Sequence, residues 1–157
     1  MLTGFSAVAG AAPAAAQEFL RIDDALSYIN RELGLASCNK PPCWRHSVSV
    51  IRTPSGYDIQ VDSQSPDGES HDLYRAPGRL LDEKKSRPFS YGPNGEVIVP
   101  CVVNGCVSDH DLKTGKNVFA QGGMSFGRFP AGPDGLQKAE RAVQSLIGLA
   151  KTTDQPL

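Results

Sequence analysis

The sequence predicts an α+β fold, in which a helix precedes and another follows an antiparallel sheet or partly open barrel of about five to seven strands. Three observations predict it. An apolar stripe with helical spacing lies near each end of the chain, and several segments between them alternate apolar and polar residues. The chain also contains 16 Gly and 12 Pro among 157 residues, which favours short strands and many turns over a helix bundle.

Residues 1–16 are uncharged, are rich in small apolar residues and end in Ala14-Ala15-Ala16. Small residues at these positions are typical of a signal-peptide cleavage site, so we expect residues 1–16 to be a signal-peptide remnant or a disordered tail. The Lys or Arg that opens a complete signal peptide is missing, and a start upstream of Met1 would supply it. The segment predicts a periplasmic or secreted protein. No run reaches the ~18 apolar residues of a membrane-spanning helix, so we expect no transmembrane segment.

Residues 17–151 are predicted to form one α+β domain, which begins with a helix over residues 17–35. Asp23 and Asp24 suit its first turns because acidic side chains complement the positive end of the helix dipole. Gly34 suits its C-cap. The apolar stripe on which this helix depends consists of Phe19, Ile22, Leu26, Ile29 and Leu33.

The first strands are predicted from alternation with a period of two. Residues 44–53 and 57–63 alternate on either side of a Pro-Ser-Gly turn and are typical of a hairpin. Residues 71–76 favour a third strand. Residues 77–88 are charged and are expected to be a long connection with one helical turn.

A second hairpin is predicted where residues 95–103 and 106–112 flank the turn signal Asn104-Gly105. Residues 117–130 supply one or two further strands, and Gly122 and Gly123 interrupt them.

The last helix is predicted over residues 133–151, because Pro and Asp favour its start and a strong apolar stripe follows. We expect residues 152–157 to fray. The stripe consists of Leu136, Ala139, Ala142, Val143, Leu146, Ile147 and Ala150.

The paired hairpins and the closing helix KAERAVQSLIGLAK together resemble the pleckstrin-homology-like barrel, here in a bacterial, exported form. The resemblance covers residues 44–151 and rests on the pattern of elements, without a diagnostic motif. It implies a binding scaffold, because that superfold mostly recognises lipids, peptides or proteins.

The four cysteines occur as two pairs with the same spacing, CNKPPC and CVVNGC. A zinc site of four thiolates is one interpretation, although the spacing lies at the edge of the usual range. A redox pair would favour a C-x-x-C motif at the start of a helix, which neither pair offers. In an exported chain, structural disulfides are the favoured state, so we predict Cys38–Cys43 and Cys101–Cys106. The spacing alone leaves the other connectivities open.

No catalytic residue, metal ligand or cofactor is predicted. Asp109, His110 and Asp111 are adjacent, but consecutive strand residues point to opposite faces, so the three do not converge. Ser70 and His71 are adjacent as well, and such side chains diverge. The net charge of −1 also argues against a nucleic-acid partner.

The sequence therefore favours a small exported, non-catalytic binding or interaction domain with two disulfides. Its alternatives are a zinc-stabilised intracellular module and a small hydrolase that uses His110 or His71. The partner is expected to be a protein, a peptide or an anionic ligand. The predicted contact surface combines three cations with two rings that an extended segment would direct to one side, namely Lys84, Lys85, Arg87, Phe89 and Tyr91.

Overall fold

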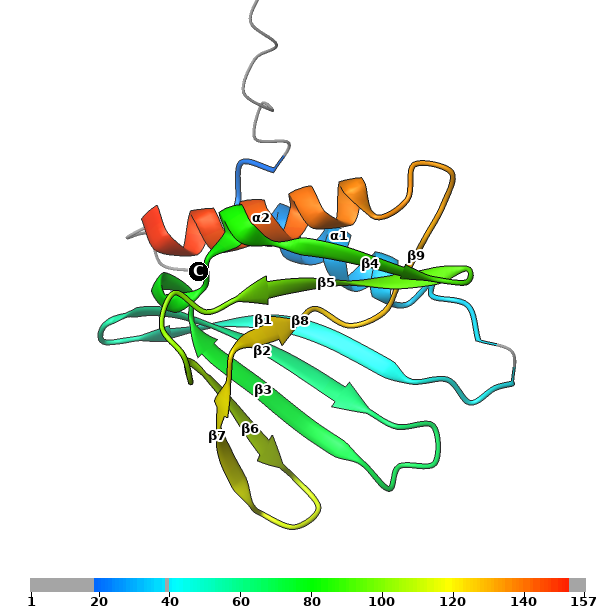
Figure 1. Cartoon of the computed structure of the whole chain (residues 1–157), viewed down its shortest axis with the longest axis horizontal. Coiled ribbons are helices and arrows are strands. Elements are labelled where there is room, and N and C mark those ends of the chain that lie inside the picture. The colour runs from blue at the N-terminus through cyan, green and yellow to red at the C-terminus, as the bar shows by residue number, and fades with distance from the viewer. Residues whose placement is uncertain (1–18, 39, 153–157) are drawn as a thin grey trace, which may run out of the picture.

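The computed structural model describes residues 19–38 and 40–152 (Figure 1). Predictions for residues 1–16 and 153–157 lie outside this range. In chain order the described elements are α1 (Ile22–Leu33), β1 (Arg45–Thr53), β2 (Gly56–Gln64), β3 (His71–Pro77), the 3-10 turns η1 (Gly78–Leu80) and η2 (Glu83–Lys85), β4 (Arg87–Tyr91), β5 (Asn94–Pro100), β6 (Val107–Asp111), β7 (Asn117–Gln121), β8 (Gly123–Ser125), β9 (Phe129–Pro130) and α2 (Gln137–Thr152).

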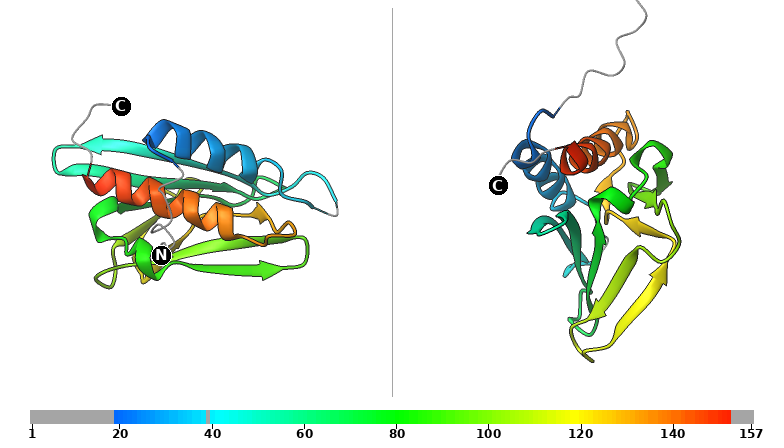
Figure 2. Two further views of the ribbon diagram at one scale, coloured as in Figure 1. Left: turned by 90° about the horizontal axis from the view of Figure 1, so that it is seen from above. Right: turned by 90° about the vertical axis from the view of Figure 1, so that its left-hand side faces the viewer.

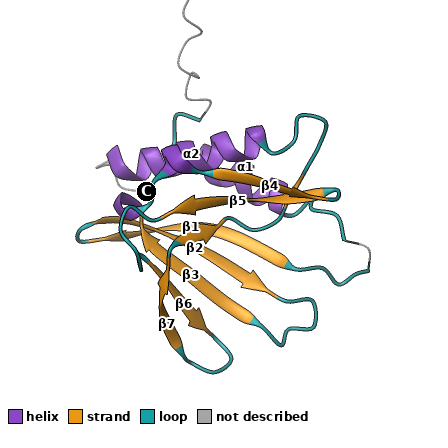
Figure 3. Ribbon diagram, in the orientation of Figure 1, coloured by secondary structure: helices purple, strands orange, loops and turns teal. Residues whose placement is uncertain are grey.

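The strands form two antiparallel sheets, and with a helix at each end they confirm the predicted fold class (Figure 3). The larger sheet has the order β1-β2-β3-β6-β7. The smaller has the order β4-β5-β8, and β9 also pairs with β5. The described strands outnumber the predicted ones because β4, β8 and β9 are short and lack a clear alternation of apolar and polar residues.

The two helices lie side by side and cover the strands from one side (Figure 2). The apolar stripe of α2 is buried as predicted, and so is most of that of α1. Helix α1 begins at Ile22, later than predicted, because the backbone at Arg21 is extended with φ −131° and ψ 147°. Gly34 is the C-cap, and its N–H donates to the carbonyl of Asn30.

The first predicted hairpin is confirmed, and the second is wrong. In β1 and β2, Val48 lies opposite Val61 and Val50 opposite Ile59, and all four side chains are buried. Strands β5 and β6 do not pair. Strand β5 pairs with β4, β8 and β9, whereas β6 pairs with β3 and β7. The Asn104-Gly105 segment therefore carries the chain from one sheet to the other.

Both predicted disulfides are formed, Cys38–Cys43 and Cys101–Cys106, each with its Cα atoms 5.8 Å apart. The first closes the loop between α1 and β1, and the second closes the loop between β5 and β6. Because all four sulfur atoms are in disulfides, none of them is a thiolate that could bind zinc in this structure.

Both sheets and both helices contribute to one hydrophobic cluster. Its largest fully buried side chains include Phe126 and Phe129, from the short segment between β8 and α2. In the described part of the chain, neither helix combines the length and the apolar character needed to cross a bilayer.

Candidate functional site

Strand β4 carries the predicted contact surface, and all five of its residues are exposed. Phe89 is 51% exposed and Tyr91 is 44% exposed, so neither ring belongs to the core. Arg87 lies two residues before Phe89 and projects from the same face of the strand. The preceding turn η2 holds the exposed Lys84 and Lys85. We call these five residues, Lys84, Lys85, Arg87, Phe89 and Tyr91, the β4 surface.

A fourth cation, Arg128, adjoins this surface. Its guanidinium carbon lies 5.9 Å from the centre of the Tyr91 ring, within the range of a cation–π contact. Two acids adjoin the surface, since Glu96 of β5 is opposite Phe89 and Lys85 Nζ lies 3.9 Å from the Asp82 carboxylate. The Glu96 carboxylate accepts a hydrogen bond of 2.8 Å from the Ser125 hydroxyl. The surface therefore combines two exposed rings with an excess of positive charge.

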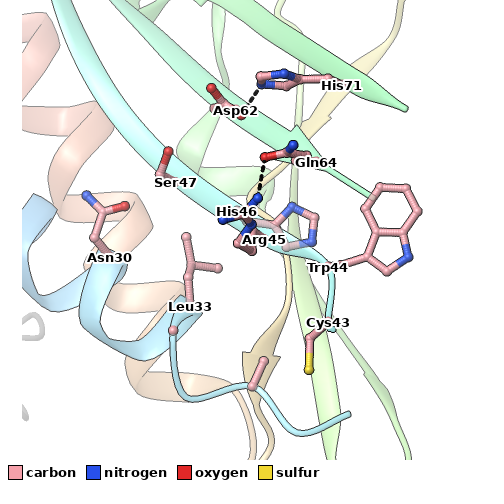
Figure 4. Close-up of a pocket in the computed structure, with 12 residues that line it drawn as sticks. Asn30, Leu33, Cys43, Trp44, Arg45, His46, Ser47, Asp62, Gln64 and His71 are labelled. Atoms are coloured by element: carbon pink, nitrogen blue, oxygen red, sulfur yellow. Dashed lines mark hydrogen bonds and ion pairs between the residues drawn. The ribbon is translucent and has the colours of Figure 1, made fainter. Parts of the chain in front are cut away.

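A separate cleft of about 530 Å³ lies between the end of α1 and the adjoining ends of β1, β2 and β3 (Figure 4). We call it the α1–β1 cleft. Leu33, Gly34 and Ala36 line its helical side, and Trp44 and His46 line its strand side. Figure 4 shows Leu33 and Trp44 on opposite sides of this space.

The segment after α1 is held in place by the start of β5. The Ser37 N–H donates to Oδ1 of Asn94 over 2.8 Å, and the side-chain amide of Asn94 donates to the Ser37 carbonyl. Asn94 is buried, so this pair of bonds fixes one wall of the cleft against the smaller sheet.

The outer face of the larger sheet contributes a polar wall to the cleft. His71 Nε2 and Asp62 Oδ1 are 2.8 Å apart, and the Arg45 guanidinium donates to Oε1 of Gln64 over 2.9 Å (Figure 4). Arg45 and Gln64 are also cross-strand neighbours. These four polar side chains therefore bond to one another in two pairs along this wall.

His46 is the aromatic wall shared by this cleft and by a smaller cavity of about 210 Å³. Its ring is parallel to that of Trp44, with an angle of 5° and 6.1 Å between centroids. Burial lowers the pKa of His46, and the positive charge of Arg128 lowers it further, against an opposing effect of Asp62. The imidazole is therefore neutral at physiological pH. Its Nδ1 is buried and has no hydrogen-bond partner among the described residues.

Two carboxyl groups form a second polar cluster on the inner face of the larger sheet. Burial, followed by the charge of Asp72 and a hydrogen bond with it, raises the pKa of Asp109 to about 6. Tyr74 lies opposite Asp109, and burial together with these two acids raises its pKa. Among the residues that the structure describes, no group of three or more His, Cys, Asp and Glu side chains is placed to hold a metal ion.

The residues of the hydrolase alternative are not brought together. The His110 Nδ1 contacts the Asn117 side chain at 2.5 Å, whereas Asp109, one residue away in β6, interacts with Asp72. The Ser70 hydroxyl donates to Asp72 over 3.0 Å, and the neighbouring His71 bonds instead to Asp62. Adjacent side chains diverge here, as strand geometry predicts.

Sequence reasoning named the residues of the β4 surface, and the structure adds that they are exposed, but it missed Arg128 and the α1–β1 cleft. The β4 surface is local, so its charges and rings are visible in one short segment. The cleft is assembled from α1, the loop after it and three strands, and the register that joins them is set by tertiary packing. The sequence did contain one signal of the cleft, because Trp44, the chain's one Trp, follows immediately after a disulfide loop.

No family model, curated protein or solved structure matches this chain. The functional argument therefore depends on the residues and geometry described above.

Proposed function

We propose that this protein is an exported, non-catalytic binding domain that contacts an acidic peptide or protein through its β4 surface. The observation that carries the proposal is that every residue of β4 is exposed, which presents Phe89 and Tyr91 beside Arg87. Large rings are costly to leave in water, and Tyr and Arg are enriched among the residues that dominate binding energy.

The chemistry of the surface favours an acidic partner. Lys84, Lys85, Arg87 and Arg128 supply positive charge around the rings, in a chain whose net charge is −1. Complementary charge speeds association and selects against basic partners. Pro88 has no N–H to donate and restricts the strand, which favours recognition by side chains and reduces the ordering cost of binding.

Two further features support the proposal. Two local disulfides are typical of proteins of an oxidising compartment, which agrees with the export that residues 1–16 predict. The resemblance to pleckstrin-homology-like domains also favours a binding role, since those scaffolds bind partners without catalysing reactions on them.

The direct test uses an array of synthetic acidic peptides, with and without aromatic residues, probed with the oxidised protein. The Lys84→Glu, Arg87→Glu double variant should bind the selected peptides at least about tenfold more weakly. The matched control is Lys113→Glu, Lys116→Glu, which makes the same change in net charge at two exposed lysines within the loop that joins β6 to β7; Figure 1 shows these two strands. The control should bind normally, and binding should weaken as salt is added.

Equal loss of binding in both double variants would show that net charge alone matters, and it would overturn the assignment to the β4 surface. Binding to anionic lipid vesicles but not to any acidic peptide would replace the proposed partner with a membrane. Export is tested separately, by the intact mass and N-terminal sequence of the protein secreted from its native cell.

A further inference from the structure

The α1–β1 cleft lies against a strand edge that is partly covered. Among the described strands, β1 is the outermost of the larger sheet and pairs with β2 alone. Further along β1, Asn30 of α1 covers the other edge. Its side-chain amide donates to the Val48 carbonyl over 2.9 Å, and its Oδ1 accepts from the Val48 N–H over 2.7 Å. The backbone groups of Val48 therefore point away from β2.

The direction of the Val48 backbone groups also sets the direction of the N–H and C=O groups of His46. Alternate residues of an antiparallel strand direct their N–H and C=O groups to the same side. His46 precedes Val48 by two residues, so its N–H and C=O also point away from β2. Among the described residues, no backbone hydrogen bond outside the strands satisfies these two groups. An unpaired donor and acceptor on a strand edge are a template for another strand.

The cleft provides side-chain contacts beside the same edge. Trp44 is 37% exposed, and its indole lies parallel to the His46 ring. Across the cleft, Gly34 has no side chain and Ala36 has only a methyl group, which leaves space, and Leu35 between them is 60% exposed. The cleft therefore has an aromatic side at Trp44 and His46 and a small, apolar side at Gly34 and Ala36, in addition to its polar wall.

We propose that the α1–β1 cleft binds an extended peptide segment, which adds as a strand to the edge of β1 at residues 44–46. An apolar or aromatic side chain of that peptide packs against Trp44. The free donor and acceptor at His46 specify a peptide backbone, since strand addition gains affinity from main-chain bonds and specificity from pockets for alternate side chains. This site does not depend on the β4 surface.

The experiment pans a random peptide library against the immobilised, oxidised protein and removes peptides that also bind an Ala36→Arg, Ser47→Arg variant. Ala36 is half-buried and Ser47 is exposed, and both line the cleft, so two long side chains fill it with little cost to the fold. Selected peptides should bind Trp44→Ala at least about tenfold more weakly than the wild type. Val103→Ser, an exposed apolar site in the other disulfide loop, is the matched control and should change the affinity by less than roughly twofold.

The backbone contact has a signature of its own. In a strand that pairs along one edge, only every second amide of the peptide faces its partner. Methylating those amides in synthetic peptides should abolish binding, and methylating the intervening amides should leave it intact. The His46 amide should also become protected from hydrogen exchange when the peptide binds.

Three outcomes overturn the proposal. The first is that no peptide remains after those that also bind the Ala36→Arg, Ser47→Arg variant have been removed. The second is affinity that does not alternate with the methylated position, which would indicate recognition by side chains alone. The third is a His46 amide whose exchange is unchanged by bound peptide. Thermal unfolding of each variant shows whether a loss of binding reflects a loss of fold.

Discussion

Asp109 shows how one residue can oppose the stability of the fold around it. Its carboxyl group lies beside that of Asp72, and Asp109 Oδ1 is buried without a hydrogen-bond partner among the described residues. Its pKa in the folded protein is about 6, above the ordinary value of 3.8. Asp109 thus ionises more easily in the unfolded chain, and the fold loses stability as the pH rises from 3.8, the ordinary pKa, to about 6.

We predict that Asp109→Asn stabilises the protein near neutral pH, because the amide cannot ionise. The gain in the free energy of unfolding should be about 1 kcal/mol at roughly pH 7.5, after allowance for partial exposure to solvent, and should vanish below about pH 4. Denaturant unfolding as a function of pH measures it.

Asp111 in the same strand is the control, because its hydrogen bonds to the Lys113 backbone and the Thr114 hydroxyl lower its pKa. Asp111→Asn should therefore destabilise the protein near neutral pH. A pH-independent effect of Asp109→Asn would contradict the proposed pairing with Asp72.

Gly127 is a position where the backbone requires glycine. Its φ is +76°, and a Cβ there would lie 2.9 Å from the Cβ and Cγ of His46 and 3.0 Å from Leu33 Cδ2. We predict that Gly127→Ala lowers the free energy of unfolding by about 1–3 kcal/mol, the cost of a strained backbone conformation. Gly132 has open space around its Cα, so Gly132→Ala should have little effect. Equal effects of the two substitutions on urea unfolding would refute this explanation.

At the scale of elements, the helices were the most predictable part of the fold. An apolar stripe with helical spacing is a local signal, and every residue of the stripe predicted for α2 is buried. The β1–β2 hairpin was predictable for the same reason. The pairing of β5 with β8 and of β3 with β6 was not, because these strands are joined through long-range packing. The turn signal inside the Cys101–Cys106 loop also led to the wrong prediction of a hairpin between β5 and β6.

Helix α2 should contribute strongly to stability, because its apolar side chains pack into the core. Leu146 is completely buried in the central cluster, so Leu146→Ala should lower the free energy of unfolding by about 2–5 kcal/mol through lost burial and a residual cavity. Gln137→Ala in the same helix is the control, since Gln137 is exposed and such changes cost less than about 0.5 kcal/mol. A similarly small loss for Leu146→Ala would mean that α2 is peripheral to the fold.

At the scale of the whole molecule, the Cys101–Cys106 disulfide closes the loop through which the chain passes between its two sheets. Replacing both residues with Ala should lower the free energy of unfolding by about 2 kcal/mol, because the short loop in the unfolded chain is no longer constrained. Alkylation of the unfolded, unreduced wild type should modify no cysteine. Four modified cysteines, or a stoichiometric zinc ion in the purified protein, would contradict both disulfides.

The two candidate binding surfaces also differ in how far the sequence could predict them. The β4 surface lies within eight consecutive residues, from Lys84 to Tyr91, so its composition was readable and only its exposure needed the structure. Arg128 joins it from a distant segment through the packing of Phe126 and Phe129. The α1–β1 cleft depends on the bonds between Asn30 and Val48, which no local pattern in the sequence indicates.

Those two bonds have a consequence for how the protein behaves in concentrated solution. By satisfying Val48, the side chain of Asn30 ends the sheet there, so a second molecule cannot extend it. When α1 is released, the uncovered edge lengthens from His46 into the apolar stretch of β1 and can recruit other chains into aggregates. Asn30→Ala should therefore accelerate aggregation on mild heating, as measured by light scattering, by more than its loss of stability accounts for. Helix α1 therefore limits aggregation through the edge of β1 in addition to packing into the hydrophobic core.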